Sequence, residues 1–114
     1  DGSPFLALGS PGGSTIITTV LQMLVNRVDL GMTLPQALAE PRATQRNTAS
    51  VQAEPTFDPA AKAALQALGH TFTVTPPPGE IGAATGIELL DDGRFLAAAE
   101  PVRRGGGSAG VVTP

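Results

Sequence analysis

A glycine-rich segment, Gly9–Thr15, lies between a short apolar run and a long helix-like stretch; it reads Gly-Ser-Pro-Gly-Gly-Ser-Thr. Paired glycines at a strand-to-helix junction allow a sharp turn, and the first turn of a helix leaves backbone N–H groups without helical partners. These donors, together with the positive end of the helix dipole, suit an anion or a carbonyl oxygen that gains negative charge. The segment therefore constrains the local fold and indicates where chemistry can occur.

Hydrophobic periodicity and turn residues predict an α+β chain that forms one domain over residues 1–114. The Asp-Asp-Gly turn at 91–93 predicts a β-hairpin, and residues 42–50 are expected to be irregular. Capping residues predict helices that begin after Thr33 and Asp58. The expected strands cover residues 3–9, 51–54, 71–75, 86–90 and 94–98, and the expected helices cover 16–28, 34–39 and 59–68.

Two segments carry predictions about burial. Strand 3–9 is almost entirely apolar, which is typical of a strand buried on both faces. Helix 16–28 has apolar residues at helical spacing, which predicts that this face packs against a core. These residues, the apolar stripe, are Ile16, Ile17, Val20, Leu21, Leu24, Val25 and Val28.

Composition excludes several classes of function. A net charge of −3 and a pI of about 4.9 argue against nucleic acid as a partner, because phosphate binding needs clustered Lys and Arg. No apolar run reaches the roughly 18 to 20 residues that span a bilayer. The chain has no cysteine, and its single histidine, His70, follows the helix-ending Gly69, where a cap or surface role is expected. We therefore expect no metal site and no cofactor.

Three interpretations of the glycine segment compete. A phosphate-binding loop would need Gly-Lys-Ser/Thr at the helix entry, and Gly13-Ser14-Thr15 has no lysine. The spacing also departs from the Gly-x-Gly-x-x-Gly of dinucleotide sites. The glycines could simply permit a tight turn that Ser10 or Ser14 caps. Alternatively, successive N–H groups could form an oxyanion hole for a tetrahedral intermediate.

An oxyanion hole needs a nucleophile, and the chain offers no convincing one. Ser10 and Ser14 have no base nearby in sequence, and the scattered carboxylates read as caps or solvated groups. An N-terminal nucleophile would need Ser, Thr or Cys first, whereas Asp1 is found. Asp1-Gly2 is also a hairpin signal with only its second strand present. We therefore expect the chain to be the C-terminal piece of a longer protein that carries the nucleophile.

Longer motifs resemble the C-terminal subunit of the gamma-glutamyltransferases, also called gamma-glutamyl transpeptidases or glutathione hydrolases. The glycine segment and the helix after it carry the most specific similarity, fourteen residues long. Residues 82–86 match only loosely, so we assign no site there, and the role of Arg103 is left open by the Glu-Pro-Val-Arg that precedes the tail. The similar segments are Gly9–Gln22, Asp29–Ala37, Glu40–Arg42, Val51–Phe57 and Arg103–Gly110.

The resemblance implies part of an N-terminal-nucleophile hydrolase fold, an αββα sandwich with two stacked sheets between helical layers. A threonine upstream, exposed by self-cleavage of a precursor, would attack the γ-glutamyl amide of glutathione or a related compound, and the acyl group would pass to water or to an amino acid. The backbone N–H groups of Gly12 and Gly13 would contact the substrate as the oxyanion hole.

The resemblance also implies partners and a location. The chain would assemble with the large subunit and the rest of the small subunit, in the periplasm or outside the cell, and would be inactive alone. Two alternatives stay open: a non-catalytic module for carboxylate binding or assembly, and a related acylase of the same fold.

Overall fold

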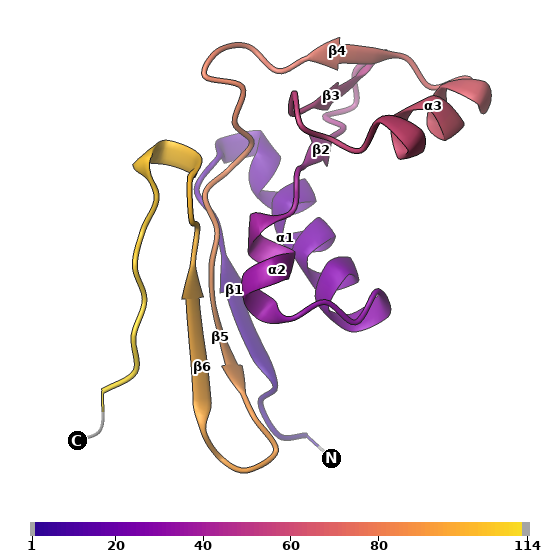
Figure 1. Ribbon diagram of the computed structural model, residues 1–114. Coiled ribbons are helices and arrows are strands. Elements are labelled where there is room, and N and C mark those ends of the chain that lie inside the picture. Colours follow the sequence, from indigo (N-terminus) through magenta and orange to yellow (C-terminus); the bar gives the residue numbers. More distant parts are fainter. Residues whose placement is uncertain (1, 113–114) are drawn as a thin grey trace.

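The structure is a computed structural model that describes residues 2–112 (Figure 1). The predicted order of helices and strands is confirmed, with one short strand added within residues 42–50. Asp1, which belongs to the hairpin signal at the start of the chain, lies outside the described residues. The elements are β1 (Leu6–Gly9), α1 (Ile16–Leu24), α2 (Leu34–Ala39), β2 (Ala43–Thr44), β3 (Val51–Ala53), α3 (Pro59–Ala67), β4 (Phe72–Val74), β5 (Thr85–Leu89) and β6 (Phe95–Ala99).

The larger sheet has the order β1-β5-β6 and is antiparallel throughout. The predicted hairpin is confirmed: β5 and β6 pair from Thr85↔Ala99 to Leu89↔Phe95, and Gly93 takes a positive φ of 81° in the turn. Helices α1 and α2 lie against one face of this sheet (Figure 1). A small core forms between them, built from Met23, Leu34, Leu38, Ala84 and Ala98, with Leu6, Leu8, Val20 and Leu96 packed around it.

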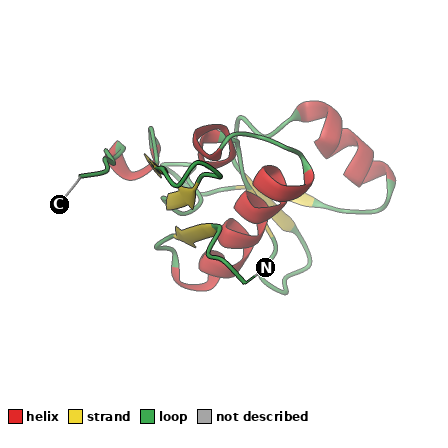
Figure 2. Cartoon of the chain, turned by 90° about the horizontal axis from the view of Figure 1, so that it is seen from below, coloured by secondary structure: helices red, strands yellow, loops and turns green. Residues whose placement is uncertain are grey.

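The smaller sheet has the order β2-β3-β4, with β2-β3 antiparallel and β3-β4 parallel. Helix α3 connects the parallel pair, and the rings of Phe57 and Phe72 stack beside it at 6.3 Å. Figures 1 and 2 both show α3 set to one side, away from α1 and α2. The chain enters this unit after α2, at β2, and leaves it after β4, along the segment that leads into β5.

Local sequence signals place the helix ends correctly. Thr33 and Gln36 form the predicted capping box at the start of α2, and the Asp58 carboxylate accepts from two N–H groups at the start of α3. At the end of α3, His70 N–H donates to the Leu65 carbonyl, and Gly69 has a φ of 97°. His70 is exposed there, as expected for a residue at a helix end.

Two burial predictions are wrong for this chain. Strand β1 is not covered on both faces, since Ala7 is exposed while Leu6 and Leu8 are half-buried. Most of the apolar stripe on α1 also faces solvent, and Ile17 is 77% exposed. The buried side of the helix carries Thr19, Met23 and Asn26. The helix continues past Leu24 as a π-helical turn, Val25–Asp29, which shifts the side chains that face the sheet.

Candidate functional site

The glycine segment forms a tight turn between β1 and α1. Gly12 has a φ of 147° and Gly13 a φ of 57°, both in regions that disfavour residues with a side chain. A 3₁₀ turn, Gly13–Thr15, leads into the helix, and the Thr15 N–H and hydroxyl both donate to the Gly12 carbonyl, at 3.1 and 3.0 Å. A Cβ on Gly12 would lie 2.3 Å from Thr15 Oγ1, so the turn requires glycine there.

Two backbone donors are left free by this turn. Among the described residues, no acceptor takes a hydrogen bond from the N–H of Gly12 or of Gly13. Gly13 is exposed and Gly12 half-buried. N–H groups at the start of a helix that have no acceptor within the protein can donate to an oxygen of a ligand.

The two serines of the segment have no base beside them. Ser10 Oγ donates to the Pro11 carbonyl at 2.8 Å and accepts from Ala83 N–H at 3.2 Å. Ser14 Oγ accepts from the Arg46 guanidinium at 3.4 Å. Within the part of the chain that the structure describes, neither hydroxyl bonds to a histidine or a carboxylate. They are therefore not activated as nucleophiles within this chain.

A group of four buried charged residues contacts segment 81–84, which in turn contacts Ser10 of the glycine turn. These residues, the buried charge cluster, are Arg42, Glu54, Glu100 and Arg103. Their side chains are 8% exposed or less. Arg103 binds Glu54 through two nitrogens, at 2.6 and 2.5 Å, and Glu100 at 2.9 Å. Arg42 binds the other oxygen of Glu100 at 3.0 Å. Two positive and two negative charges thus neutralise one another away from water.

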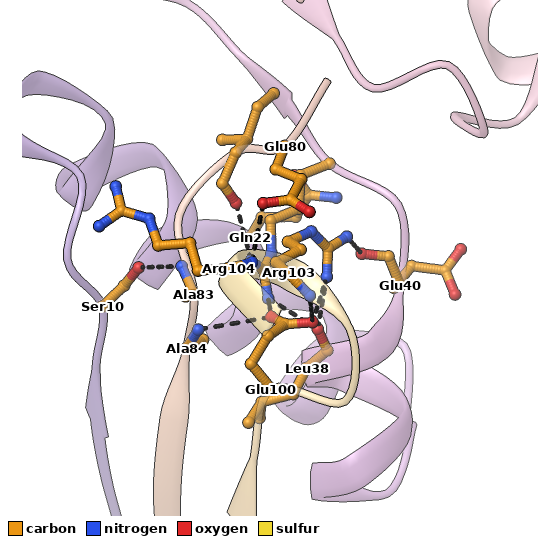
Figure 3. A network of polar contacts seen from close by, with 12 residues as sticks. Ser10, Gln22, Leu38, Glu40, Glu80, Ala83, Ala84, Glu100, Arg103 and Arg104 are labelled. Atoms are coloured by element: carbon orange, nitrogen blue, oxygen red, sulfur yellow. Dashed lines mark hydrogen bonds and ion pairs between the residues drawn. The ribbon is translucent and has the colours of Figure 1, made fainter. Parts of the chain in front are cut away.

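The arginines of the cluster also bind backbone carbonyls. Arg42 donates to Ile81 O at 2.8 Å and Arg103 to Glu40 O at 2.8 Å. Both reach Leu38 O, at the C-terminal end of α2. Figure 3 shows Arg103 between Glu40, Leu38 and Glu100. The cluster therefore joins helix α2 to the segment that enters β5 and to the end of β6.

Pairing decides the ionisation of these groups. Burial alone raises the pKa of the Glu54 carboxyl, but hydrogen bonds from Arg103 and from the N–H groups of Ile81 and Arg42 outweigh it, so the pKa lies below its usual value. Burial lowers the pKa of Arg103, yet its bonds to Glu54 and its pairing with Glu100 leave it raised. Burial, and then repulsion from Arg103, lowers the pKa of Arg42. Arginine nonetheless stays protonated in proteins.

A second ion pair joins helix to sheet. Arg27, in the π-helical turn, binds the buried Glu88 of β5 through two nitrogens and lies 5.4 Å from the centre of the Phe5 ring. The hydrogen bond from Arg27 outweighs burial and lowers the pKa of Glu88. The same bond raises the pKa of Arg27.

The sequence predicts that nearly all the carboxylates are caps or solvated groups. This prediction is wrong for Glu54, Glu88 and Glu100, which are buried and paired. Arg103, whose role the sequence leaves open, has a structural role, because it pairs with Glu54 and Glu100. A signal was present, because Glu40-Pro-Arg42 and Glu100-Pro-Val-Arg103 place an arginine soon after a Glu-Pro pair. It could not reveal that Arg42 and Glu100, 58 residues apart, meet.

Acid should destabilise the fold through these carboxylates. The pKa values of Glu54 and Glu88 are below the usual 4.5, so their stabilisation is complete above about pH 4.5 and is lost as the pH falls through the lowered values. We expect the free energy of unfolding of the full-length protein to fall below that pH. Glu88→Gln should reduce this dependence in urea titrations from pH 3 to 7, and an equal slope in variant and wild type would contradict the assignment.

Comparisons with known proteins agree with the fold. A profile of the gamma-glutamyltranspeptidase family matches residues 1–110. The chain is 34% identical over 106 residues to a glutathione hydrolase proenzyme of Bacillus subtilis, covering 92% of this chain and 18% of that protein. The cephalosporin acylase of Bacillus halodurans superposes with a TM-score of 0.84 and 28% identity, covering 98% of this chain and 21% of that one.

A Helicobacter pylori gamma-glutamyltranspeptidase mutant superposes with a TM-score of 0.75 and 34% identity, covering 85% of this chain and 53% of that one. The α+β fold is thus that of part of an N-terminal-nucleophile hydrolase. The chain belongs to the gamma-glutamyltranspeptidase family. It spans less than a fifth of the length of the Bacillus subtilis relative. None of the described helices is long and apolar enough to cross a membrane.

Proposed function

We propose that the protein containing this chain hydrolyses or transfers γ-glutamyl groups, and that Gly12 and Gly13 supply its oxyanion hole. The observation that carries the proposal is the pair of N–H groups left free at the glycine turn, in a chain of this family. The nucleophile is a threonine upstream of the chain, with its own α-amine as base. Related glutathione hydrolases support glutathione and similar γ-glutamyl compounds as the substrate class.

In this proposal the glycine turn stabilises the negative charge that develops on the substrate's carbonyl oxygen. Attack of the threonine oxygen on the γ-carbonyl carbon converts the carbonyl oxygen into an oxyanion. Two N–H groups fixed by the turn bind this oxygen more tightly than the ground-state carbonyl, so they lower the barrier. The amine then leaves with a proton, and water or an amino acid accepts the acyl group. Removal of one such donor costs about 10²–10³ in kcat in comparable sites.

Uncovered apolar surface supports assembly with the rest of a precursor. On the face of the larger sheet opposite the helices, Ala7, Thr85 and Ile87 are exposed. In an αββα sandwich this face packs against a second sheet. Ile17 and Leu21, from the apolar stripe of α1, are also exposed and suit a further contact with the same precursor. Export to the periplasm or the cell exterior stays a prediction from the family resemblance.

Turnover of γ-glutamyl-p-nitroanilide tests the function. The full-length protein should release p-nitroaniline, whereas the purified 114-residue chain should release none, because an oxyanion hole has no covalent step to assist without a nucleophile. Turnover by the isolated chain would contradict this division of roles. Saturable amide shifts at Gly12 and Gly13 on glutamate titration, without turnover by the full-length protein, would instead favour a binding module.

The likeness to a cephalosporin acylase favours a second candidate, an acylase of the same fold. Glutaryl-p-nitroanilide separates the two, because it keeps the scissile amide and the terminal carboxylate but lacks the α-amino group. A γ-glutamyl enzyme should strongly prefer the substrate with the amino group, since the polar groups that bind it would otherwise be left unpaired. Equal or better kcat/KM on the glutaryl compound would favour the acylase.

A further inference from the structure

The segment 81–84, which leads into β5, passes directly behind the glycine turn. Ala83 N–H donates to Ser10 Oγ at 3.2 Å, and Figure 3 shows these two groups facing each other. Gly82 is buried between the turn and the helix that follows it. A Cβ on Gly82 would lie 2.6 Å from Ser10 Oγ and 2.9 Å from Thr19 Oγ1. The backbone at Gly82 therefore packs against both the turn and helix α1, with no room for a side chain.

The same segment is fixed from the other side by the buried charge cluster. Ile81 N–H donates to Glu54 at 2.8 Å, and Ala84 N–H donates to Glu100 at 3.4 Å. The Ile81 carbonyl accepts from Arg42 at 2.8 Å. Charged hydrogen bonds of this kind, in a site of low dielectric, hold backbone more firmly than neutral contacts do. The segment is thus hydrogen-bonded to the cluster at both ends, and Ala83, between them, is hydrogen-bonded to Ser10.

We propose that Ser10 and segment 81–84, together the brace, are positioning residues that set the place of the Gly12 and Gly13 N–H groups. This inference rests on the proposed function. Oxyanion donors act at 2.7–3.1 Å, and a displacement of about 1 Å can cost about 100-fold in rate. Ser10 lies two residues before Gly12, so a shift of the brace moves the donors without touching the substrate.

Gly82→Ala in the full-length enzyme tests the brace, with Gly93→Ala as the matched control. Both glycines have a positive φ, 68° and 81°, but a Cβ on Gly93 meets nothing within 4 Å. Gly82→Ala should lower kcat for γ-glutamyl-p-nitroanilide by at least about tenfold, with KM within about twofold of wild type. A tetrahedral boronate analogue of glutamate should bind more weakly by a similar factor, while glutamate itself should not. Gly93→Ala should match wild type in kcat, in KM and in its affinity for both ligands.

Ser10→Ala is the second variant, because it removes the bond to Ala83 without adding an atom. Hydrogen–deuterium exchange provides a readout that does not need activity. Peptides covering residues 9–15 should exchange faster in Gly82→Ala and Ser10→Ala than in wild type or Gly93→Ala, and peptides covering β6 should not. The difference should come from the Thr15 N–H, which donates to the Gly12 carbonyl in the wild type. Unchanged exchange in 9–15 together with kcat within twofold of wild type in both variants would overturn the brace. Faster exchange in both variants, together with no turnover by the wild-type protein, would support the brace and overturn the proposed function alone.

Discussion

Gly13→Pro in the full-length enzyme is expected to lower kcat by about two to three orders of magnitude, because proline removes one of the two N–H groups of the proposed oxyanion hole. The proposed donors act mainly on the charge of the transition state, so KM should change far less than kcat. The measurement is steady-state hydrolysis of γ-glutamyl-p-nitroanilide, normalised to the fraction of enzyme that has matured by self-cleavage. A rate near wild type would contradict the oxyanion assignment.

Proline also disturbs the backbone, since Gly13 has a φ of 57° and proline requires about −65°. Two controls separate this effect. Gly13→Ala keeps the N–H, and its Cβ meets nothing within 4 Å, so it should keep most of the activity at a cost of about 1 kcal/mol in stability. Gly31→Pro places proline at a φ of 68° in an exposed loop, and should leave kcat close to wild type. An equal loss of kcat in Gly31→Pro would attribute the effect to general destabilisation.

Local signals in the sequence were enough to predict most elements. The Asp-Asp-Gly turn marks the β5-β6 hairpin, and Thr33 and Asp58 mark the starts of α2 and α3. In each case a few adjacent residues decide the backbone, through hydrogen bonds that form within one turn. The two-residue strand β2 was missed because its pairing with β3, and not its own composition, defines it.

Burial and the charge cluster depended on contacts that the sequence does not display. The apolar stripe of α1 correctly indicates a helix, yet Ile17 and Val28 are exposed and Thr19 is buried. Periodicity reports which face prefers an apolar environment, whereas burial depends on which neighbours are present. Charged residues are almost never fully buried unless paired, so a partner distant in the sequence decides whether Glu100 is buried.

Arg103→Met should lower the free energy of unfolding by about 3–5 kcal/mol, since it leaves a buried carboxylate without its cation. Glu54 would lose both hydrogen bonds from the guanidinium, and Arg42 alone would face two carboxylates. Chemical denaturation of the full-length protein measures the change. Arg94→Met is the matched control: its pair with Asp92 is exposed, so the change should stay within about 1 kcal/mol. Equal losses in the two variants would contradict the pairing argument.

Combining Arg103→Met with Glu54→Gln separates the charge effect from lost packing. If the single variants destabilise because each strands an opposite charge, the double variant removes both charges and should lose less stability than the sum of the two. An additive result would mean that packing, and not pairing, dominates. Because the cluster also holds Ile81 and Ala84, Arg103→Met should lower kcat even at temperatures where the enzyme stays folded. Stability and catalysis would then depend on the same four side chains, all of which lie outside the glycine turn.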